Sequence, residues 1–384
     1  MDKKIKILTV VGTRPEAIKL APLLSEFSCH DGLIESRVCA TAQHRAQLDQ
    51  VLGLFGIEPD WDLDTMRNQQ DLLELMNRIV IGIRRVFREW GPDLVLAQGD
   101  TMTTFSVSLA AFHEKIEVGH VEAGLRSGKP DTPWPEEIYR KLATVLARRH
   151  FAPTQLAKSN LVSEGVSENS IWVTGNTAVD AVLGVTRKFE CDPQMRREID
   201  RRFSFLNPQK KLIVATAHRR ESHGKDIDSI CSAISQLARR NDVEIVFPVH
   251  LNPNVDRPVR EQLKGHANVH LTGPLLYQEF IGLLCRSYFV ITDSGGIQEE
   301  APSLRKPVLV TRSITERPEA IATGMIRIVG ADTNRVVVEA EQLLDDEIHY
   351  RSMRMGNNPY GDGRAASRIV AALTGSTFEP FVAL

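Results

Sequence analysis

"DLVLAQGDTMTTFSVSLAAFHEKIEVGHVEA" runs from Asp93 to Ala123 and decides the fold. Two apolar runs, at 93–99 and 117–123, flank a stretch from Thr101 to Lys115 that has a helical pattern. Near-continuous runs of Val, Leu and Ile are typical of strands that are buried on both faces, as in a parallel sheet. The stretch therefore predicts one strand-helix-strand unit of such a sheet.

The same alternation continues along most of the chain. Helical patterns occur at 15–27, 136–149 and 226–240. Alternating strands and helices predict an α/β fold in which a parallel sheet is doubly wound. The other apolar runs lie at 5–12, 36–41, 150–154, 171–176, 211–218, 243–250, 268–273, 288–294, 307–311 and 326–330.

The alternation pauses between about 176 and 210, where residues 177–190 have a helical pattern and the charged stretch at 191–211 has no strand pattern. We therefore predict two Rossmann-like domains, residues 1–172 and 173–363, with a cleft between them. Ligands of open α/β sheets bind beyond the carboxyl ends of the strands, so the residues that follow the apolar runs are the functional candidates.

Composition narrows the class of protein. The 384 residues are 42% hydrophobic and 25% charged, with a net charge of −2, which gives no bulk attraction to nucleic acid or an anionic membrane. No apolar run reaches the roughly 18 residues that span a bilayer. The apolar run at 5–12 indicates a first strand and not a signal peptide. Five scattered cysteines predict reduced core thiols in a cytoplasmic protein.

The first strand is followed by two cations, Arg14 and Lys19, near the start of a predicted helix. A helix dipole disfavours cations at that end. They are either solvated charges or part of an anion site that also uses helix N–H groups.

Three carboxylates follow strands of the first domain. Asp100 follows Gly99 and is either a helix N-cap or a functional acid. Glu122 ends an apolar strand and is either a buried, paired carboxylate or a functional one. Glu136 shares a helix face with Arg140, as a surface pair or as part of a site. Clustered acids separate one another's pKa values, so the three together predict acid/base chemistry.

The second domain offers candidates for an anion site. His218 ends a strand beside two arginines, as a structural histidine or a phosphate contact. "DSGGIQEEAPSL" (Asp293–Leu304) follows a strand, and its two glycines predict a turn that receives phosphate at a helix N-terminus. Two glutamates, Glu299 and Glu300, follow there although carboxylates repel phosphate. Phe280 either packs in the core or forms a surface that contacts the base ring of a nucleotide.

Other chemistries lack their signatures. The sequence contains no HExxH motif, and no acidic cluster has the spacing of an EF-hand, so no metal is expected. The GxGxxG fingerprint is absent, which argues against a nicotinamide cofactor. No GxSxG motif and no Cys–His signature is present.

Ten motifs in this order resemble the non-hydrolysing UDP-N-acetylglucosamine 2-epimerase family, from residue 5 to about 372. They are "GTRPEAIKLAP", "TAQHRAQLDQVL", "QGDTMTT", "GHVEAGLRS", "PWPEE", "AHRRES", "HLNPN", "DSGGIQEEAPSL", "ERPEA" and "NPYGDG". The resemblance implies a GT-B-like architecture in which the last helix, within 364–384, packs back on the first domain. It implies a homodimer that needs no cofactor and converts UDP-GlcNAc reversibly to UDP-ManNAc. The implied route is anti elimination of UDP to 2-acetamidoglucal, followed by re-addition.

The resemblance also implies residue roles. Acid/base or sugar-contacting roles fall on Asp100, Glu122 and Glu136, and His218 falls close to the diphosphate. A carboxylate one helical turn beyond the phosphate turn can accept hydrogen bonds from a ribose diol, the role implied for Glu300. The remaining implied substrate contacts are Arg14, Lys19, Arg140, Phe280, Ser294, Gly295, Gly296 and Arg317.

Departures from the family pattern leave alternatives open. Some members are activated by a second substrate molecule through a "QHRQ"-like stretch; Gln43 and His44 match it as possible regulatory residues, but Ala46 does not. A hydrolysing relative that releases ManNAc and UDP, or an epimerase acting on a modified UDP-HexNAc, shares the elimination step. A GT-B glycosyltransferase and a non-catalytic nucleotide-sugar-binding module are further alternatives.

Overall fold

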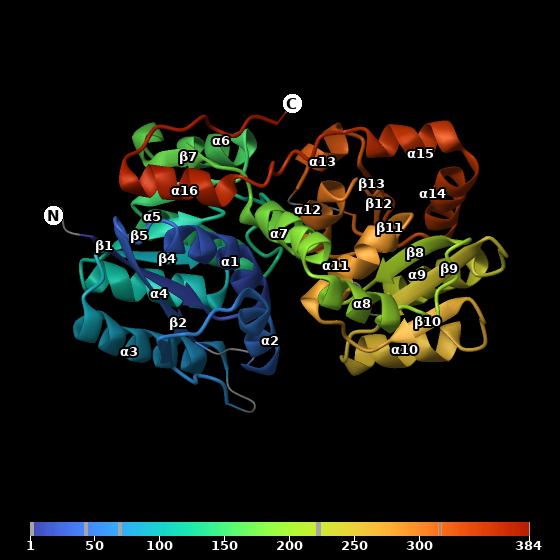
Figure 1. Cartoon of the computed structure of the whole chain (residues 1–384), viewed down its shortest axis with the longest axis horizontal. Helices are drawn as coiled ribbons and strands as arrows, with labels where there is room; N and C mark the ends of the chain where they lie inside the picture. The colour runs from blue at the N-terminus through green and yellow to red at the C-terminus, as the bar shows by residue number, and fades with distance from the viewer. Residues whose placement is uncertain are drawn as a thin grey trace. The chain divides into compact units, whose positions relative to one another are not determined.

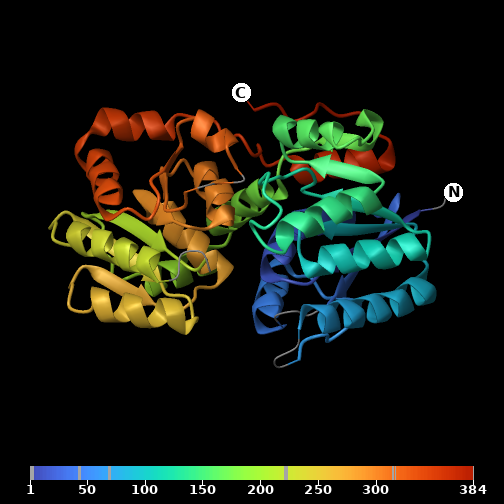
Figure 2. The ribbon, with the colours of Figure 1, turned by 180° about the vertical axis from the view of Figure 1, so that it is seen from behind.

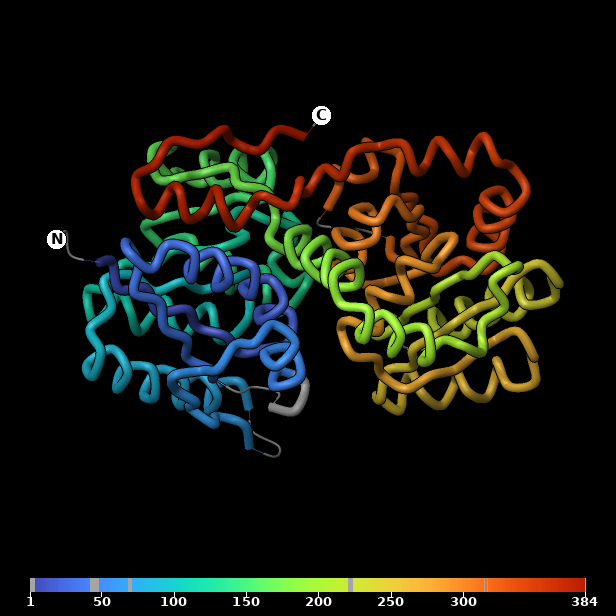
Figure 3. The backbone as a smooth tube through the Cα atoms, in the orientation of Figure 1, coloured from blue at the N-terminus to red at the C-terminus, as the bar shows by residue number. Residues whose placement is uncertain are grey.

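The computed structural model describes residues 4–41, 45–67, 71–219, 224–313, 315 and 317–383. They form two compact units, between which the chain passes twice (Figures 1 and 3). Unit 1 comprises the chain up to Ala181 together with Tyr360–Ala383, and unit 2 comprises Val182–Pro359. The division falls near the predicted boundaries at 172 and 363.

Unit 1 is built on a seven-stranded parallel sheet with the order β3-β2-β1-β4-β5-β6-β7. The direction of winding reverses between β1 and β4, which makes this pair the topological switch point of the sheet. The strands are β1 (Ile5–Val11), β2 (Ile34–Ala40), β3 (Trp61–Asp62), β4 (Leu94–Gln98), β5 (Glu117–Val121), β6 (Arg149–Ala152) and β7 (Ile171–Val173).

Helices cover both faces of this sheet. Helices α1, α2 and α16 lie on one face, and α3, α4 and α5 lie on the other (Figures 1 and 2). Helix α7 leads the chain out of unit 1, and α16 brings it back against α1. The bounds are α1 (Arg14–Ser28), α2 (Arg45–Phe55), α3 (Leu72–Trp90), α4 (Met102–His113), α5 (Glu136–Leu146), α6 (Gln155–Ser163), α7 (Thr177–Cys191) and α16 (Ala365–Thr374), with a 3-10 turn at Glu168–Ser170.

Unit 2 contains a six-stranded parallel sheet with the order β10-β9-β8-β11-β12-β13. Its winding reverses between β8 and β11, so this pair is the switch point of the second sheet. The strands are β8 (Lys211–Thr216), β9 (Val243–Pro248), β10 (Val269–Thr272), β11 (Phe289–Thr292), β12 (Val308–Val310) and β13 (Ile326–Ile328).

The helices of unit 2 also pack on its sheet, and α9 contacts both α10 and α14. An apolar cluster between these helices and the strands includes Ile234, Phe247 and Phe289. The helices are α8 (Pro193–Arg202), α9 (Lys225–Leu237), α10 (Pro253–Leu263), α11 (Tyr277–Arg286), α12 (Gly295–Ser303), α13 (Glu319–Ala322), α14 (Thr333–Asp345) and α15 (Glu347–Arg354).

Local chemistry explains where the elements near the sites begin. Thr13 caps α1 through the N–H of Glu16, and the N3 glutamate returns a bond to the cap, which is a capping box. Strand β4 is buried along its whole length, as its unbroken apolar run predicts. The predicted α/β fold with two doubly wound parallel sheets is confirmed.

Two other predictions can be compared with the structure. Within the described ranges, no helix is both long and apolar enough to cross a bilayer. All five cysteines are free, but Cys29 and Cys191 are exposed, so the prediction that all were core thiols was wrong for these two.

Candidate active site

The turn from β4 to α4 presents Asp100. Gly99 takes the left-handed conformation (φ +75°) that lets the chain turn there, and Thr101 caps α4 by accepting the N–H of Thr104 at 3.1 Å. His120 is buried, burial lowers its pKa to about 4, and its neutral ring donates from Nε2 to the carbonyl oxygen of Gly99 at 2.6 Å. Asp100 is therefore not the helix cap, and its carboxylate is available for other contacts.

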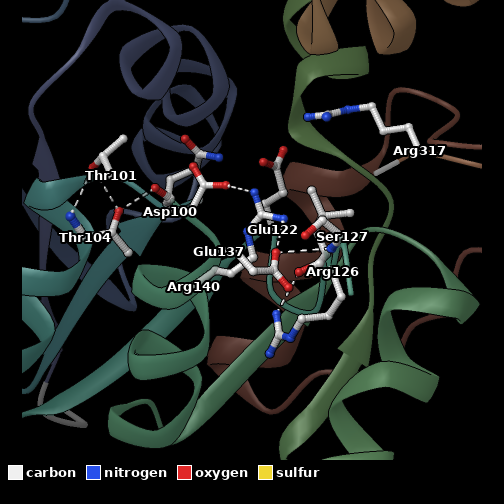
Figure 4. Close-up of polar contacts among 12 residues, drawn as sticks. Asp100, Thr101, Thr104, Glu122, Arg126, Ser127, Glu137, Arg140 and Arg317 are labelled. Atoms are coloured by element: carbon white, nitrogen blue, oxygen red, sulfur yellow. Dashed lines mark hydrogen bonds and ion pairs between the residues drawn. The ribbon is translucent and has the colours of Figure 1, made fainter. Parts of the chain in front are cut away.

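That carboxylate forms an ion pair with the buried guanidinium of Arg140 on α5 (Figure 4). A second nitrogen of Arg140 donates to Oε2 of Glu137 at 3.0 Å. Glu137 is fully buried and also accepts the backbone N–H of Ser127 at 3.1 Å, which ties the loop after β5 to the helix. Of the two alternatives for Arg140, the solvated surface pair is excluded, because Arg140 is a buried cation between two carboxylates.

The turn after β5 presents Glu122, which has a left-handed backbone (φ +66°). Non-glycine residues rarely adopt this conformation, and they concentrate at functional sites. The carboxylate is buried, binds the ammonium group of Lys19 on α1, and accepts Nδ2 of Asn176 at 2.8 Å. Lys19 is therefore not a solvated charge; it is a buried partner of Glu122.

Glu136 is the first residue of α5 and is half-buried. Its Oε2 atom is buried and has no hydrogen-bond partner in the part of the chain that the structure describes. The pKa of the nearby Tyr139 is raised by burial and by the charge of Glu136. A buried carboxylate oxygen without a partner is unusual and is able to take up a proton or a ligand hydroxyl.

A further carboxyl group, that of Glu16, lies at the switch point of unit 1. Its Oε2 accepts the N–H groups of Gly12 and Thr13, at 3.1 and 2.6 Å, and its Oε1 accepts the hydroxyl of Thr101 at 2.7 Å. The residue is 1% exposed, and burial raises its pKa to about 7 against the effect of these hydrogen bonds. The sequence analysis assigned no functional role to Glu16.

The switch point of unit 2 is joined by Asp293, which follows β11. Its Oδ2 accepts the backbone N–H groups of His218 and Arg219, each at 2.9 Å, and its Oδ1 lies 3.1 Å from Nδ1 of His218. Burial alone would raise the pKa of this carboxyl, but the His218 side chain and the two N–H groups lower it to about 2. Asp293 is thus an ionised group that orients His218.

The N-terminus of α12 is arranged for an anion. Ser294 is the N-cap residue but makes no capping bond through its side chain, so helix N–H groups remain for another acceptor. A Cβ added at Gly295 would lie 2.7 Å from Nη1 of Arg317 and 3.2 Å from Nη2 of Arg219, whereas one added at Gly296 would meet no atom within 4 Å. Two guanidinium groups therefore lie against the first turn of the helix.

Glu299 holds one of these cations in place. Glu299 is 1% exposed and accepts Nε of Arg317 at 2.5 Å. The sequence had placed a carboxylate, which repels phosphate, close to a turn predicted to receive phosphate. This conflict is removed because the charge of Glu299 is paired with that of Arg317.

The remaining predicted residues are spread over both units. Arg14 is the first residue of α1 and is half-buried, Phe280 is half-buried on α11, and Glu300 is buried on α12. Gln43 and His44 lie outside the described residues. Among the described residues, no group of three or more His, Cys, Asp or Glu side chains could hold a metal ion.

The two units therefore offer different chemistry. Unit 1 carries carboxylates held by buried cations at the carboxyl ends of adjacent strands, which is suited to proton transfer. Unit 2 carries a helix N-terminus with two arginines and an oriented histidine, which is suited to a diphosphate.

Two doubly wound units of this kind define a GT-B-like protein. A glycosyltransferase from Rickettsia africae has this fold, with a TM-score of 0.60 at 14% identity over 97% of this chain and 98% of that one. At this identity the likeness extends to the fold alone.

More similar proteins define the family. The family model for UDP-N-acetylglucosamine 2-epimerase matches residues 29–374. The UDP-N-acetylglucosamine 2-epimerase of Yersinia pestis is 52% identical over 370 residues, which cover 96% of this chain and 98% of that protein. The crystal structure of UDP-GlcNAc 2-epimerase from Neisseria meningitidis bound to UDP-GlcNAc has a TM-score of 0.93 at 46% identity, covering 97% of this chain and 100% of that one. The chain belongs to the UDP-N-acetylglucosamine 2-epimerase family, which confirms the predicted family and the predicted enzyme class, an isomerase.

Sequence reasoning missed several groups that hold the predicted residues. They are Glu16, Glu137, Asn176 and Asp293. Each is a polar residue within two positions of the first residue of a helix, which is a detectable signal. Their partners come from distant segments, which local patterns do not reveal.

Proposed function

We propose that this chain interconverts UDP-GlcNAc and UDP-ManNAc by inverting C2 of the sugar. The observation that carries the proposal is the pair of cation-held carboxylates, Asp100 with Arg140 and Glu122 with Lys19, at the ends of the adjacent strands β4 and β5. Family membership and the UDP-GlcNAc bound to the Neisseria relative support this substrate.

Unit 2 binds UDP in this proposal. The N–H groups of Gly295 and Gly296 at the start of α12, with Arg317, receive the diphosphate, and His218 approaches it through Nε2 because Nδ1 faces Asp293. Glu300 accepts hydrogen bonds from the ribose hydroxyls, and the half-buried ring of Phe280 lies by the uracil.

The reaction proceeds by elimination and re-addition. One carboxylate of unit 1 takes the proton from C2, the C–H electrons form the C1–C2 double bond, and the C1–O bond breaks with its electron pair leaving on UDP. The product is 2-acetamidoglucal. UDP then adds back to C1 while a second acid delivers a proton to the opposite face of C2. The C2 proton is weakly acidic, so the loss of UDP must accompany proton removal, which requires donors on the diphosphate.

The three carboxylates of unit 1 share the acid/base work. The buried Oε2 of Glu136, without a partner in the described part of the chain, is suited to receive a proton. Lys19 and Arg140 keep Glu122 and Asp100 in fixed orientations, which a proton transfer over a hydrogen-bond distance requires.

Deuterium incorporation tests this function. The protein is incubated with UDP-GlcNAc in deuterated water, and the sugar is followed by NMR. UDP-ManNAc that carries deuterium at C2 supports the proposal. Accumulation of free ManNAc would instead identify the hydrolysing reaction, and unchanged UDP-GlcNAc would exclude both reactions on this substrate.

We further infer that the chain forms a homodimer through unit 1. Helix α5 exposes Ile138, Leu142 and Val145, which lie on one face at helical spacing. The neighbouring helix α4 exposes Phe112, and Phe105 of α4 stacks on Tyr139 of α5 with ring centroids 5.4 Å apart, so the two helices with exposed apolar residues lie side by side (Figure 2). Exposed apolar residues on two adjacent helices indicate an interaction site, and a second copy of the chain is the occupant we propose.

A further inference from the structure

The carboxyl group of Glu16 connects the turn after β1 to the turn after β4 in unit 1. These turns flank the crevice in which open α/β sheets bind their ligands. The crevice lies between β1 and β4, because the winding of the sheet reverses there. The turn after β1 leads to Arg14, and the turn after β4 carries Asp100. Glu16 lies between the two turns and bonds to both.

Each oxygen of the Glu16 carboxyl serves one turn. Oε2 accepts the backbone N–H groups of Gly12 and Thr13, in the turn after β1. Oε1 accepts the hydroxyl of Thr101, directly after Asp100, at 2.7 Å. The hydroxyl of Thr104 donates to the carbonyl oxygen of Gln98 at 2.6 Å, which closes the turn that contains Asp100 from the other side.

Helix capping does not account for this arrangement. A capping box needs only Thr13 and Glu16, which lie in the same turn. The bond to Thr101 spans 85 positions in the sequence and reaches a different helix. Glu16 is 1% exposed, whereas Glu74 at the same N3 position of α3 is exposed. Burial of a carboxyl without a cation is costly, so a residue that only caps a helix would be expected at the surface.

The sheet of unit 2 uses a related device. Asp293 joins the turn after β8 to the turn after β11 across the switch point of that sheet. There the joined group is His218, which the carboxylate orients. In unit 1 the joined group is the turn that carries Asp100.

We propose that Glu16 is a positioning residue for the epimerisation: it locks the Asp100 turn to the β1 turn and so fixes where the Asp100 carboxylate meets the sugar. The inference rests on the proposed function. Glu16 does not touch the substrate in this role; it acts through Thr101 and the backbone of the turn.

The test compares Glu16→Ala and Glu16→Gln with the parent in the deuterium-incorporation assay, with kcat and KM measured separately. Glu16→Ala removes the link, and we expect kcat to fall roughly ten- to a hundredfold with KM changed less than about threefold. Glu16→Gln should stay within about threefold of the parent, because the amide oxygen can accept both N–H groups and the amide nitrogen can donate to the Thr101 hydroxyl. Glu74→Ala is the matched control and should keep parental kcat.

A double-mutant cycle separates positioning from general stability. In an Asp100→Asn background, Glu16→Ala should change the residual exchange rate by less than about twofold, because the turn matters only through the Asp100 carboxylate. Equal effects in both backgrounds, or a Glu16→Ala protein that melts earlier but turns over normally, would overturn the proposal. A Glu16→Gln protein as slow as Glu16→Ala would also overturn it.

Two further comparisons are needed, one in case a variant does not fold and one to separate the role of Glu16 from the epimerase function. If Glu16→Ala does not fold, Thr101→Ala and Thr101→Ser replace it, and only the serine variant should retain kcat. A parent that exchanges no deuterium contradicts the epimerase function itself, whereas an active parent with fully active variants contradicts only the role of Glu16.

Discussion

The Nδ1 atom of His218 lies 3.1 Å from Oδ1 of Asp293, so the carboxylate faces this nitrogen of the ring and not Nε2. Hydrogen bonds from the His218 side chain and from backbone N–H groups overcome the effect of burial and lower the pKa of Asp293 to about 2, so the carboxylate is an acceptor at neutral pH. An ionised acceptor beside Nδ1 favours the tautomer with its proton on that nitrogen, and in the proposed function Nε2 then faces the diphosphate.

Asp293→Asn should reverse this arrangement, because an amide can donate to Nδ1 and so favours the other tautomer. We expect kcat to fall by at least about a hundredfold while the amide oxygen keeps the turn bonds to the backbone. Steady-state kinetics measure the loss, and 15N NMR of the histidine reports the tautomer. Asp332→Asn, at the N-cap of α14, is the control and should keep parental kcat; parental kcat in Asp293→Asn would refute the orienting role.

Gly295→Ala should weaken UDP binding. The new Cβ would lie 2.7 Å from Nη1 of Arg317, so the guanidinium must shift from its place at the first turn of α12. Loss of a charge-assisted contact of this type predicts a Kd for UDP about tenfold higher. Isothermal titration calorimetry measures it, with Gly184→Ala as the control because a Cβ there meets no atom within 4 Å. Unchanged affinity would show that Arg317 does not bind the diphosphate.

Asn176→Asp should slow exchange at C2. The substitution places a second carboxylate against Oε2 of Glu122, and neighbouring like charges make one of the two retain a proton. Asp keeps the oxygen that accepts the N–H of Ala178, so α7 should still form. We expect kcat at pH 7 to fall roughly ten- to a hundredfold. Asn207→Asp, which preserves a similar turn bond at the surface, should leave kcat unchanged.

Leu142→Glu should dissociate the proposed homodimer, because it places a charge within the apolar surface of α4 and α5. Analytical ultracentrifugation should show a dimer for the parent and a monomer for this variant at micromolar concentrations. Val338 on α14 of unit 2 is a more exposed apolar position outside this surface, and the Val338→Glu variant should remain dimeric. A monomeric parent would exclude the homodimer.

The stability of unit 1 should fall as pH rises, in part because of Glu16. Burial raises the pKa of this carboxyl from its usual 4.5 to about 7, so its favourable contribution is complete below about 4.5 and is lost as pH rises through 7. The difference between these two pKa values corresponds to roughly 3 kcal/mol of unfolding free energy. Urea unfolding at pH 5 and pH 8 should show a larger decrease for the parent than for Glu16→Gln. Equal decreases in the two proteins would show that Glu16 does not titrate in this range.

The fold was predictable because buried parallel strands have a distinctive composition. The runs ending at Gln98 and Val121 identify β4 and β5, and the polar residues that follow them, Asp100 and Glu122, are the candidates that the structure places at the strand ends. Strand β3, which has only two residues, has no such signal and was not predicted.

The partners of the site residues were not predictable in the same way. Asn176 lies 54 positions from Glu122, and Thr101 lies 85 positions from Glu16. Which strand ends become neighbours depends on the strand order, and β1 adjoins β4 only because the winding reverses there. A local pattern such as the capping box at Thr13 and Glu16 can be read directly, but the second role of the same carboxyl group cannot.

The return of the chain to unit 1 has a consequence for how the protein is made. Helix α16 packs on α1, Asp180 accepts the N–H groups of Ala365 and Ala366 at its start, and Arg368 donates to the carbonyl oxygen of Thr174. All of unit 2 is synthesised before these contacts can form. Unit 2 can therefore fold while the ribosome is still translating, whereas unit 1 must wait with part of α1 uncovered until the last helix has emerged.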